Sequence, residues 1–238
     1  MNKRRNNAIY VLAVLSLMIA IMFIFGFTPI GTITTGTLSI TLMGIPVSII
    51  ACVFGPWMGL MAGAVWGCIS IIQAFTGYDQ TAILLQQCVA NGEITNARFL
   101  AGLIVMCLVA RMLVGFLTGL IYDSIKIVDK RGYIATVVSC MSTALLNTIL
   151  FMTSFCLFFY GTAVIDHLGT FSNPFTFVFA IIGVNFVVEF LVNCFAGSAI
   201  VFGLNVAATK LKVNAPFPHF FVKKEIKKEE TNVSQTEK

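Results

Sequence analysis

The chain has 238 residues, of which 58% are apolar and only 11% are charged, and its mean hydropathy is +0.93. A soluble domain carries about 25% charged residues, so this composition excludes a cytosolic enzyme, a DNA-binding module and a secreted disulfide scaffold. At roughly 20 apolar residues per span, the length allows at most about six or seven membrane-spanning helices. The sequence therefore predicts an all-α integral membrane protein that forms one bundle.

Six apolar segments are predicted to form transmembrane helices, at residues 8–27, 42–54, 57–75, 99–122, 133–160 and about 175–208. The second is a short helix, and it ends at Gly55-Pro56 because proline cannot continue a helix. The sixth starts after Asn173-Pro174, a side-chain cap followed by proline at the first helical position. Residues 1–208 thus form the membrane domain, and residues 209–238 a charged cytoplasmic tail that is partly disordered.

The segments between the spans are more polar. Residues 28–41 are rich in Thr, Gly and Ser, and residues 37–42 alternate polar and apolar side chains, which predicts an extended loop or a short strand. Within the polar segment that follows the third span, residues 81–90 are predicted to form a short interfacial helix.

The basic residues predict the orientation in the membrane. Of 15 Lys and Arg residues, thirteen fall in the N-terminus, the 123–132 loop and the tail; only Arg98 lies in a predicted outside loop and Arg111 within a span. By the positive-inside rule both termini are cytoplasmic. The loops at 28–41, 76–98 and 161–174 then face outside.

Two ionisable residues lie inside predicted spans, where charge is costly: Arg111 in the fourth and Glu189 in the sixth. Both fall at similar depth, so a buried ion pair between them is predicted. Asn147 lies at comparable depth, and Asn185 and Asn193 share the helix face of Glu189. Three interpretations are open: an ion pair that holds helices together, the floor of a solute pocket, and a proton relay.

Outside the spans, hydroxyl groups offer hydrogen bonds to a polar solute. The loop candidates for solute binding are Thr35, Thr37, Ser39 and Tyr78. The alternative is that the hydroxyl-rich loop binds no solute and simply has the composition that is common at membrane interfaces. His167 and Asp166 are interpreted as a solvated pair.

Small residues recur on two helix faces. Their positions are Gly59, Gly63 and Gly67 in the third span, and Ala13, Ser16 and Ala20 in the first. Small residues at this spacing let helix backbones approach closely, so the glycines predict helix packing. The face on the first span serves either an internal neighbour or another subunit.

Several chemistries are absent from the sequence. It contains no GxxxxGK[ST], HExxH or GxSxG motif, so the chain is predicted not to be an enzyme and not to hydrolyse ATP. The seven cysteines lie mostly in apolar runs, without CxxC or a Cys/His cluster of zinc-ligand spacing. No metal and no cofactor is predicted.

Residues 28–70, TPIGTITTGTLSITLMGIPVSIIACVFGPWMGLMAGAVWGCIS, resemble the substrate-binding S components of energy-coupling factor (ECF) vitamin transporters. The similar features are a polar first loop, an IPV segment at Ile45-Pro46-Val47, the Gly55-Pro56 turn and a glycine-rich third helix. Six helices and cytoplasmic termini fit the same family. The arrangement looks most like the pantothenate-type branch, with the folate and riboflavin types next.

The resemblance implies a subunit in a prokaryotic plasma membrane that captures a vitamin outside and releases it inside. It would do so together with a transmembrane T component and two ATPase subunits. The small face of the first helix would contact the T component. The vitamin would be bound near the outer side by Thr35, Thr37, Ser39, Tyr78, Asn147, Asn185 and Glu189.

Two other functions are open. A stand-alone secondary transporter would use Arg111 and Glu189 as ion-coupling charges, although the chain shows no inverted repeat or paired broken helices. A membrane scaffold or intramembrane enzyme is the third hypothesis, and no nucleophile–base or metal constellation favours it.

Overall fold

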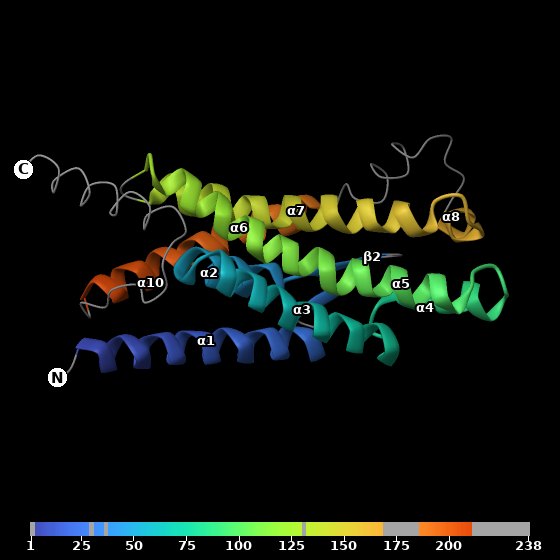
Figure 1. The fold of residues 1–238 in the computed structure, drawn as a ribbon, viewed down its shortest axis with the longest axis horizontal. Helices are drawn as coiled ribbons and strands as arrows, with labels where there is room; N and C mark the ends of the chain where they lie inside the picture. Colours follow the sequence, from blue (N-terminus) through green and yellow to red (C-terminus); the bar gives the residue numbers. More distant parts are fainter. Residues whose placement is uncertain (1–2, 29–30, 36–37, 130–131, 169–185, 211–238) are drawn as a thin grey trace, which may run out of the picture.

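The protein is a bundle of helices that run along a common long direction (Figure 1), in a computed structural model that describes residues 3–28, 31–35, 38–129, 132–168 and 186–210. Its elements are α1 (Lys3–Phe27), β1 (Thr32–Thr35), β2 (Leu38–Thr41), α2 (Gly44–Phe54), α3 (Pro56–Thr76), α4 (Gln80–Ala90), α5 (Asn96–Ile104), η1 (Val105–Val109), α6 (Ala110–Lys126), α7 (Tyr133–Phe159), α8 (Ala163–Leu168), η2 (Asn193–Gly197) and α10 (Ser198–Lys210). Here η1 and η2 are single π-helical turns within longer helices.

Five described helices are long and apolar enough to cross a membrane. They cover Ala8–Phe27, Pro56–Thr76, Asn96–Lys126, Tyr133–Phe159 and Phe186–Ala208. The remaining predicted span corresponds to α2, whose 11 residues rise only about 16 Å, half the thickness of a bilayer core. The predicted helical bundle of a multi-pass membrane protein is confirmed, with α2 as a short helix within it.

The loop after α1 is a two-stranded hairpin. Strands β1 and β2 pair antiparallel, with Thr32 opposite Thr41 and Thr35 opposite Leu38, so the period-two alternation did predict extended structure. Helix α2 follows directly and ends at Phe54, where Gly55 adopts a φ of 89° and Pro56 begins α3. The predicted break between the second and third helices is confirmed. The predicted helix start at Asn173-Pro174, residues 175–185 and the tail beyond Lys210 lie outside the described residues.

Glycines bring α3 and α6 into backbone contact. The glycines of α3 and the backbone carbonyls that they face are Gly59 and Gly115, Gly63 and Arg111, and Gly67 and Cys107. A Cβ on any of these three glycines would lie under 3.0 Å from the facing carbonyl. The predicted packing role is confirmed, and it determines how close α3 approaches the helix that carries Arg111.

The buried side chains form two clusters. One includes Met22, Val47, Trp66 and Val114 and joins α1, α2, α3 and α6. The other includes Leu85, Phe99, Phe155, Phe159 and Val164 and joins α4, α5, α7 and α8. It lies toward what we call the far end of the bundle, where α4, α8 and the α4–α5 connection are found (Figure 1).

The opposite end of the bundle holds the start of α1, the α6–α7 connection and the end of α10 (Figure 1). These are three of the places where basic residues gather in the sequence. The described basic residues at this end are Lys3, Arg4 and Arg5 at the start of α1, Lys126 at the end of α6 and Lys210 at the end of α10. The direction in which the bundle crosses a membrane stays a prediction.

Candidate functional site

A buried carboxylate links three elements of the bundle. Glu189 is 7% exposed. Its Oε1 accepts a hydrogen bond from the backbone N–H of Thr41 at 2.9 Å, and its Oε2 accepts one from Asn147 Nδ2 at 3.4 Å. The carboxylate therefore joins the end of β2 to α7 and to its own helix. Both hydrogen bonds satisfy a charge that would otherwise be stranded in an apolar interior.

Asn193 extends this polar group by one helical turn. Its Nδ2 donates to the backbone carbonyl of Glu189 at 2.9 Å, which fixes the amide on the same face as the carboxylate. A Cβ at Gly44 would lie 3.2 Å from the Asn193 amide atoms, so glycine at the start of α2 lets that helix approach closely. Asn193 Oδ1 is buried and has no hydrogen-bond partner among the described residues.

Arg111 is also 7% exposed. Its guanidinium carbon lies 5.0 Å from the centroid of the Trp66 ring, a cation–π geometry. Its Nη1 donates to the Cys107 carbonyl at 3.4 Å, and its Nε has no partner among the described residues. Trp66 lies between Gly63 and Gly67 in α3, so the glycine packing places its ring beside Arg111.

Arg111 and Glu189, both of which the structure describes, are not in direct contact. No ion pair of 4.0 Å or less joins them, so the structure does not show the predicted buried pair. The physical reason is that each charge has other partners. The Arg111 guanidinium lies over the Trp66 ring and donates a hydrogen bond to a carbonyl of its own helix. The Glu189 carboxylate accepts hydrogen bonds from Thr41 and Asn147.

The two helices that carry Arg111 and Glu189 each contain a π-helical turn next to the site. Segment η1 ends at Val109, two residues before Arg111, and η2 begins at Asn193. Such turns occur frequently at functional sites. Sequence reasoning missed both turns, because no composition or spacing signal distinguishes a π-helical turn from an α-helical one. The sequence analysis also left out of the site both Trp66, which contributes a ring face, and Thr41, which binds through its backbone.

The described loop candidates for solute binding lie in the hairpin and in the connection between α3 and α4. Thr35 lies at the end of β1 and Ser39 in β2, where their backbones pair with Leu38 and Thr34. Tyr78 is 53% exposed in the connection between α3 and α4, with its N–H bonded to Gln73. Thr37 and Asn185 lie outside the described residues. Of the predicted solute-binding residues, the structure brings Asn147 and Glu189 into contact.

The small face of α1 is directed outward. Ala13, Ser16 and Ala20 are exposed, whereas Val14, Met18 and Met22 on the opposite face are buried. The Ser16 hydroxyl donates to the carbonyls of Leu12 and Ala13, so its polar group is satisfied within the helix. Of the two open interpretations, this exposure favours contact with another subunit over packing against an internal neighbour.

Comparison with known families places most of the chain in one family model. A family model described as "ECF transporter, substrate-specific component" matches residues 11–201. A comparison with curated proteins finds no match to this chain. The matched region contains Arg111 and Glu189, the hairpin, the glycine-rich helix and the exposed face of α1.

Proposed function

From the premise that this chain belongs to the family of substrate-specific components of ECF transporters, we propose that it captures a water-soluble vitamin, with pantothenate as the best candidate. The family makes the chain the substrate-specific subunit of a multi-pass membrane transporter that works with T and ATPase components. We propose two ATPase subunits and a location in a prokaryotic plasma membrane.

Arg111 is the observation that carries the choice of substrate. A buried guanidinium with an Nε that has no partner among the described residues retains hydrogen-bonding capacity for an anion, and a carboxylate matches the geometry of the guanidinium group. Pantothenate has one carboxylate and folate has two, whereas riboflavin has none. This chemistry favours the first two vitamins over the third.

The side-chain amides of Asn147 and Asn193 can form hydrogen bonds with the uncharged part of such a ligand. Asn147 and Asn193 present amide groups on the Glu189 side of the site, and Asn193 Oδ1 is an unpartnered acceptor among the described residues. Pantothenate has two hydroxyl groups and an amide N–H that can donate to such acceptors. A small ligand with one carboxylate and several donors therefore complements Arg111 and the amides together.

Binding measurements on the purified chain test the proposal. Pantothenate, folate and riboflavin are titrated by calorimetry into wild type and Arg111→Gln, with Arg98→Gln, an exposed arginine in α5, as the matched control. Loss of a charged hydrogen bond costs about 1.5–3 kcal/mol, so Arg111→Gln is expected to weaken pantothenate binding by roughly tenfold or more. Arg98→Gln is expected to bind like wild type. Binding of riboflavin but not pantothenate would contradict the proposal.

We further propose that the chain is not an enzyme and that ATP hydrolysis belongs to the ATPase subunits. The absence of a Walker lysine motif from the full sequence supports this division of labour. ATPase activity measured on the chain alone is then expected to stay at background, and to appear only when the ATPase subunits are added.

A further inference from the structure

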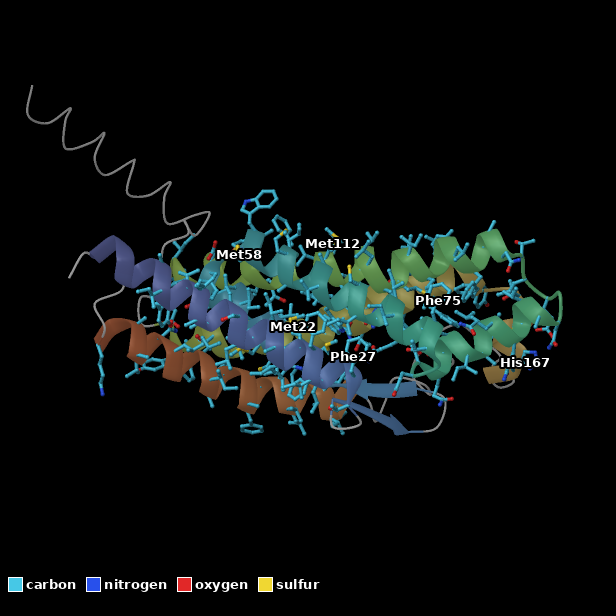
Figure 2. The ribbon with its side chains drawn as sticks, turned by 90° about the horizontal axis from the view of Figure 1, so that it is seen from below. Met22, Phe27, Met58, Phe75, Met112 and His167 are labelled. Atoms are coloured by element: carbon cyan, nitrogen blue, oxygen red, sulfur yellow. The ribbon has the colours of Figure 1, made fainter. Side chains whose placement is uncertain are left out.

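We propose that Cys88, Glu93 and His167 form a binding site for a divalent transition-metal ion, with Zn²⁺ as the best fit. The three residues come from the end of α4, the α4–α5 connection and α8. Their side-chain donor atoms all lie within 4.8 Å of one another. Figure 2 shows His167 at the far end of the bundle, beside the α4–α5 connection.

The contacts already draw the donors together. His167 Nε2 lies 3.2 Å and 3.0 Å from the two carboxylate oxygens of Glu93, and Cys88 Sγ lies within 4.8 Å of the donor atoms of both residues. In a tetrahedral zinc site the bond lengths imply donor–donor distances of roughly 3.3–3.7 Å. Small rotations of the Glu93 and His167 side chains therefore bring the three donors to coordination distance.

The donor set is typical of zinc. Thiolate, imidazole and carboxylate ligands together favour Zn²⁺ over Mg²⁺ and Ca²⁺, which take oxygen ligands. The side chains of His167 and Glu93 are 44% and 25% exposed, so an ion has access from solvent. Water can then complete the fourth position of a tetrahedral site.

The backbone around the ligands is firmly held. The N–H of Glu93 donates to the Cys88 carbonyl at 2.9 Å, across a turn in which Gly92 has a φ of 77°. The Cys88 side chain is 1% exposed in the far-end cluster, and Val164 of α8 is fully buried in the same cluster. The two pieces of chain that carry the ligands therefore share one apolar support, which orients the donors before an ion arrives.

Metal binding exchanges one proton for one cation at sulfur. On binding, the S–H bond breaks, a sulfur–metal bond forms and the proton passes to water. His167 binds as the neutral ring with its proton on Nδ1, which leaves the Nε2 lone pair for the ion.

Such an ion would tie two segments that are far apart in sequence. Glu93 and His167 are separated by 74 positions, and a bridging ion would replace their single hydrogen-bonded contact by two coordinate bonds. The α4–α5 connection and α8 would then move as one unit at the far end. No spacing rule could indicate this site, because metal motifs are recognised from ligands close in sequence.

Metal-binding measurements on the full chain in mild detergent test the site. Chelator-treated, reduced protein is titrated with Zn²⁺ and with Co²⁺. The variants are Cys88→Ala, Glu93→Gln and His167→Gln, with Cys68→Ala, an exposed cysteine, and His219→Gln, the second of two histidines, as matched controls. Wild type is expected to bind one ion per chain and to show tetrahedral Co²⁺ absorption with a thiolate charge-transfer band.

Because loss of a supporting residue alone weakens metal binding by about 10–100-fold, each ligand variant is expected to lose at least that much affinity. Both controls should bind like wild type. If Cys88→Ala does not fold, Glu93→Gln and His167→Gln, which change solvent-accessible side chains, carry the test. Equal affinity in ligand variants and controls, or Co²⁺ absorption without a thiolate band, would overturn the proposal. Neither result bears on vitamin binding, which is measured separately.

Discussion

Glu189 and Arg111 are equally buried but differ in how their hydrogen-bonding groups are used. Both oxygens of the Glu189 carboxylate accept hydrogen bonds, from β2 and from α7, whereas Nε of Arg111 has no partner among the described residues. We infer that Glu189 mainly holds the hairpin against the helices, while Arg111 keeps capacity for a ligand. A measurement of stability and one of binding should separate the two roles.

A double-mutant cycle tests the contact between Asn147 and Glu189. Glu189→Ala leaves two donors unpaired and is expected to lower the free energy of unfolding by about 2 kcal/mol, and Asn147→Ala by about 1 kcal/mol. Because the two side chains share one hydrogen bond, the double mutant should lose about 1 kcal/mol less than the sum. Unfolding in detergent measures all four proteins.

The control pair combines Glu189→Ala with Ser142→Ala, also on α7, whose hydroxyl bonds to its own helix at Val138. These losses are expected to add to within about 0.5 kcal/mol. Additive losses for Asn147 and Glu189 as well would show that their contact does not contribute to stability.

At the residue scale the sequence predicted that Arg111 and Glu189 are buried, but not which groups they contact. Glu189, Arg111 and Asn147 were identified because polar residues inside a span are costly. Their partners were missed for a physical reason: Thr41 contributes a backbone N–H, and Trp66 contributes a ring face. Neither kind of partner is visible in a pattern of polar side chains.

Among the elements, α3 and α6 are the pair whose separation is determined by glycine. The glycines of α3 lie directly against backbone carbonyls of α6 and η1, so backbone would have to move to admit even a methyl group. The position of Trp66 beside Arg111 depends on this close approach.

Gly63→Ala tests the close approach. It is expected to destabilise the protein by about 1–3 kcal/mol, the usual cost of overpacking against a rigid neighbour. Gly203→Ala, in α10 with nothing within 4 Å of the added Cβ, is the control and should be neutral or stabilising by up to about 1 kcal/mol. Thermal unfolding measures the stability of both variants. Equal stability of Gly63→Ala and Gly203→Ala would contradict the packing argument.

The sequence predicted the long helices well, because sustained apolar runs and the Gly55-Pro56 break are strong signals. Helix α8 was missed because its six residues are too few to show a periodic pattern. His167 was assigned to Asp166 for the same reason: without α8, nothing indicated that the fold brings it to Glu93.

For the whole molecule, the orientation in the membrane is the first open prediction. Asn91 lies in the exposed α4–α5 connection and Val128 in the α6–α7 connection, at opposite ends of the bundle. In intact cells an impermeant maleimide is expected to label Asn91→Cys, and to label Val128→Cys only after permeabilisation. The unaltered chain controls for the native cysteines. The reverse pattern would invert the predicted topology.

The exposed face of α1 gives a prediction about assembly. Ser16→Leu and Ala20→Leu add bulk where small residues permit close helix contact, so they are expected to abolish uptake by the complete transporter. Ligand binding by the isolated chain should stay unchanged, because this face points away from Glu189 and the core. Ala199→Leu, at an exposed alanine of α10, is the control. Loss of binding together with uptake would assign the face to folding instead.

In genetic terms, the π-helical turn η1 behaves as one inserted codon. An α-helix bonds residue i to i−4 and a π-helical turn spans one residue more, so deleting Val109 would leave α5 and α6 facing their present neighbours. Leu113 is 40% exposed and Val109 is 41% exposed, so the two positions are well matched. Deleting Leu113 would rotate the rest of α6 by about 100°. We expect the protein that lacks Val109 to accumulate in membranes near wild-type levels, and the protein that lacks Leu113 not to, as measured by immunoblot. Equal loss of both proteins would show that η1 tolerates no change in length.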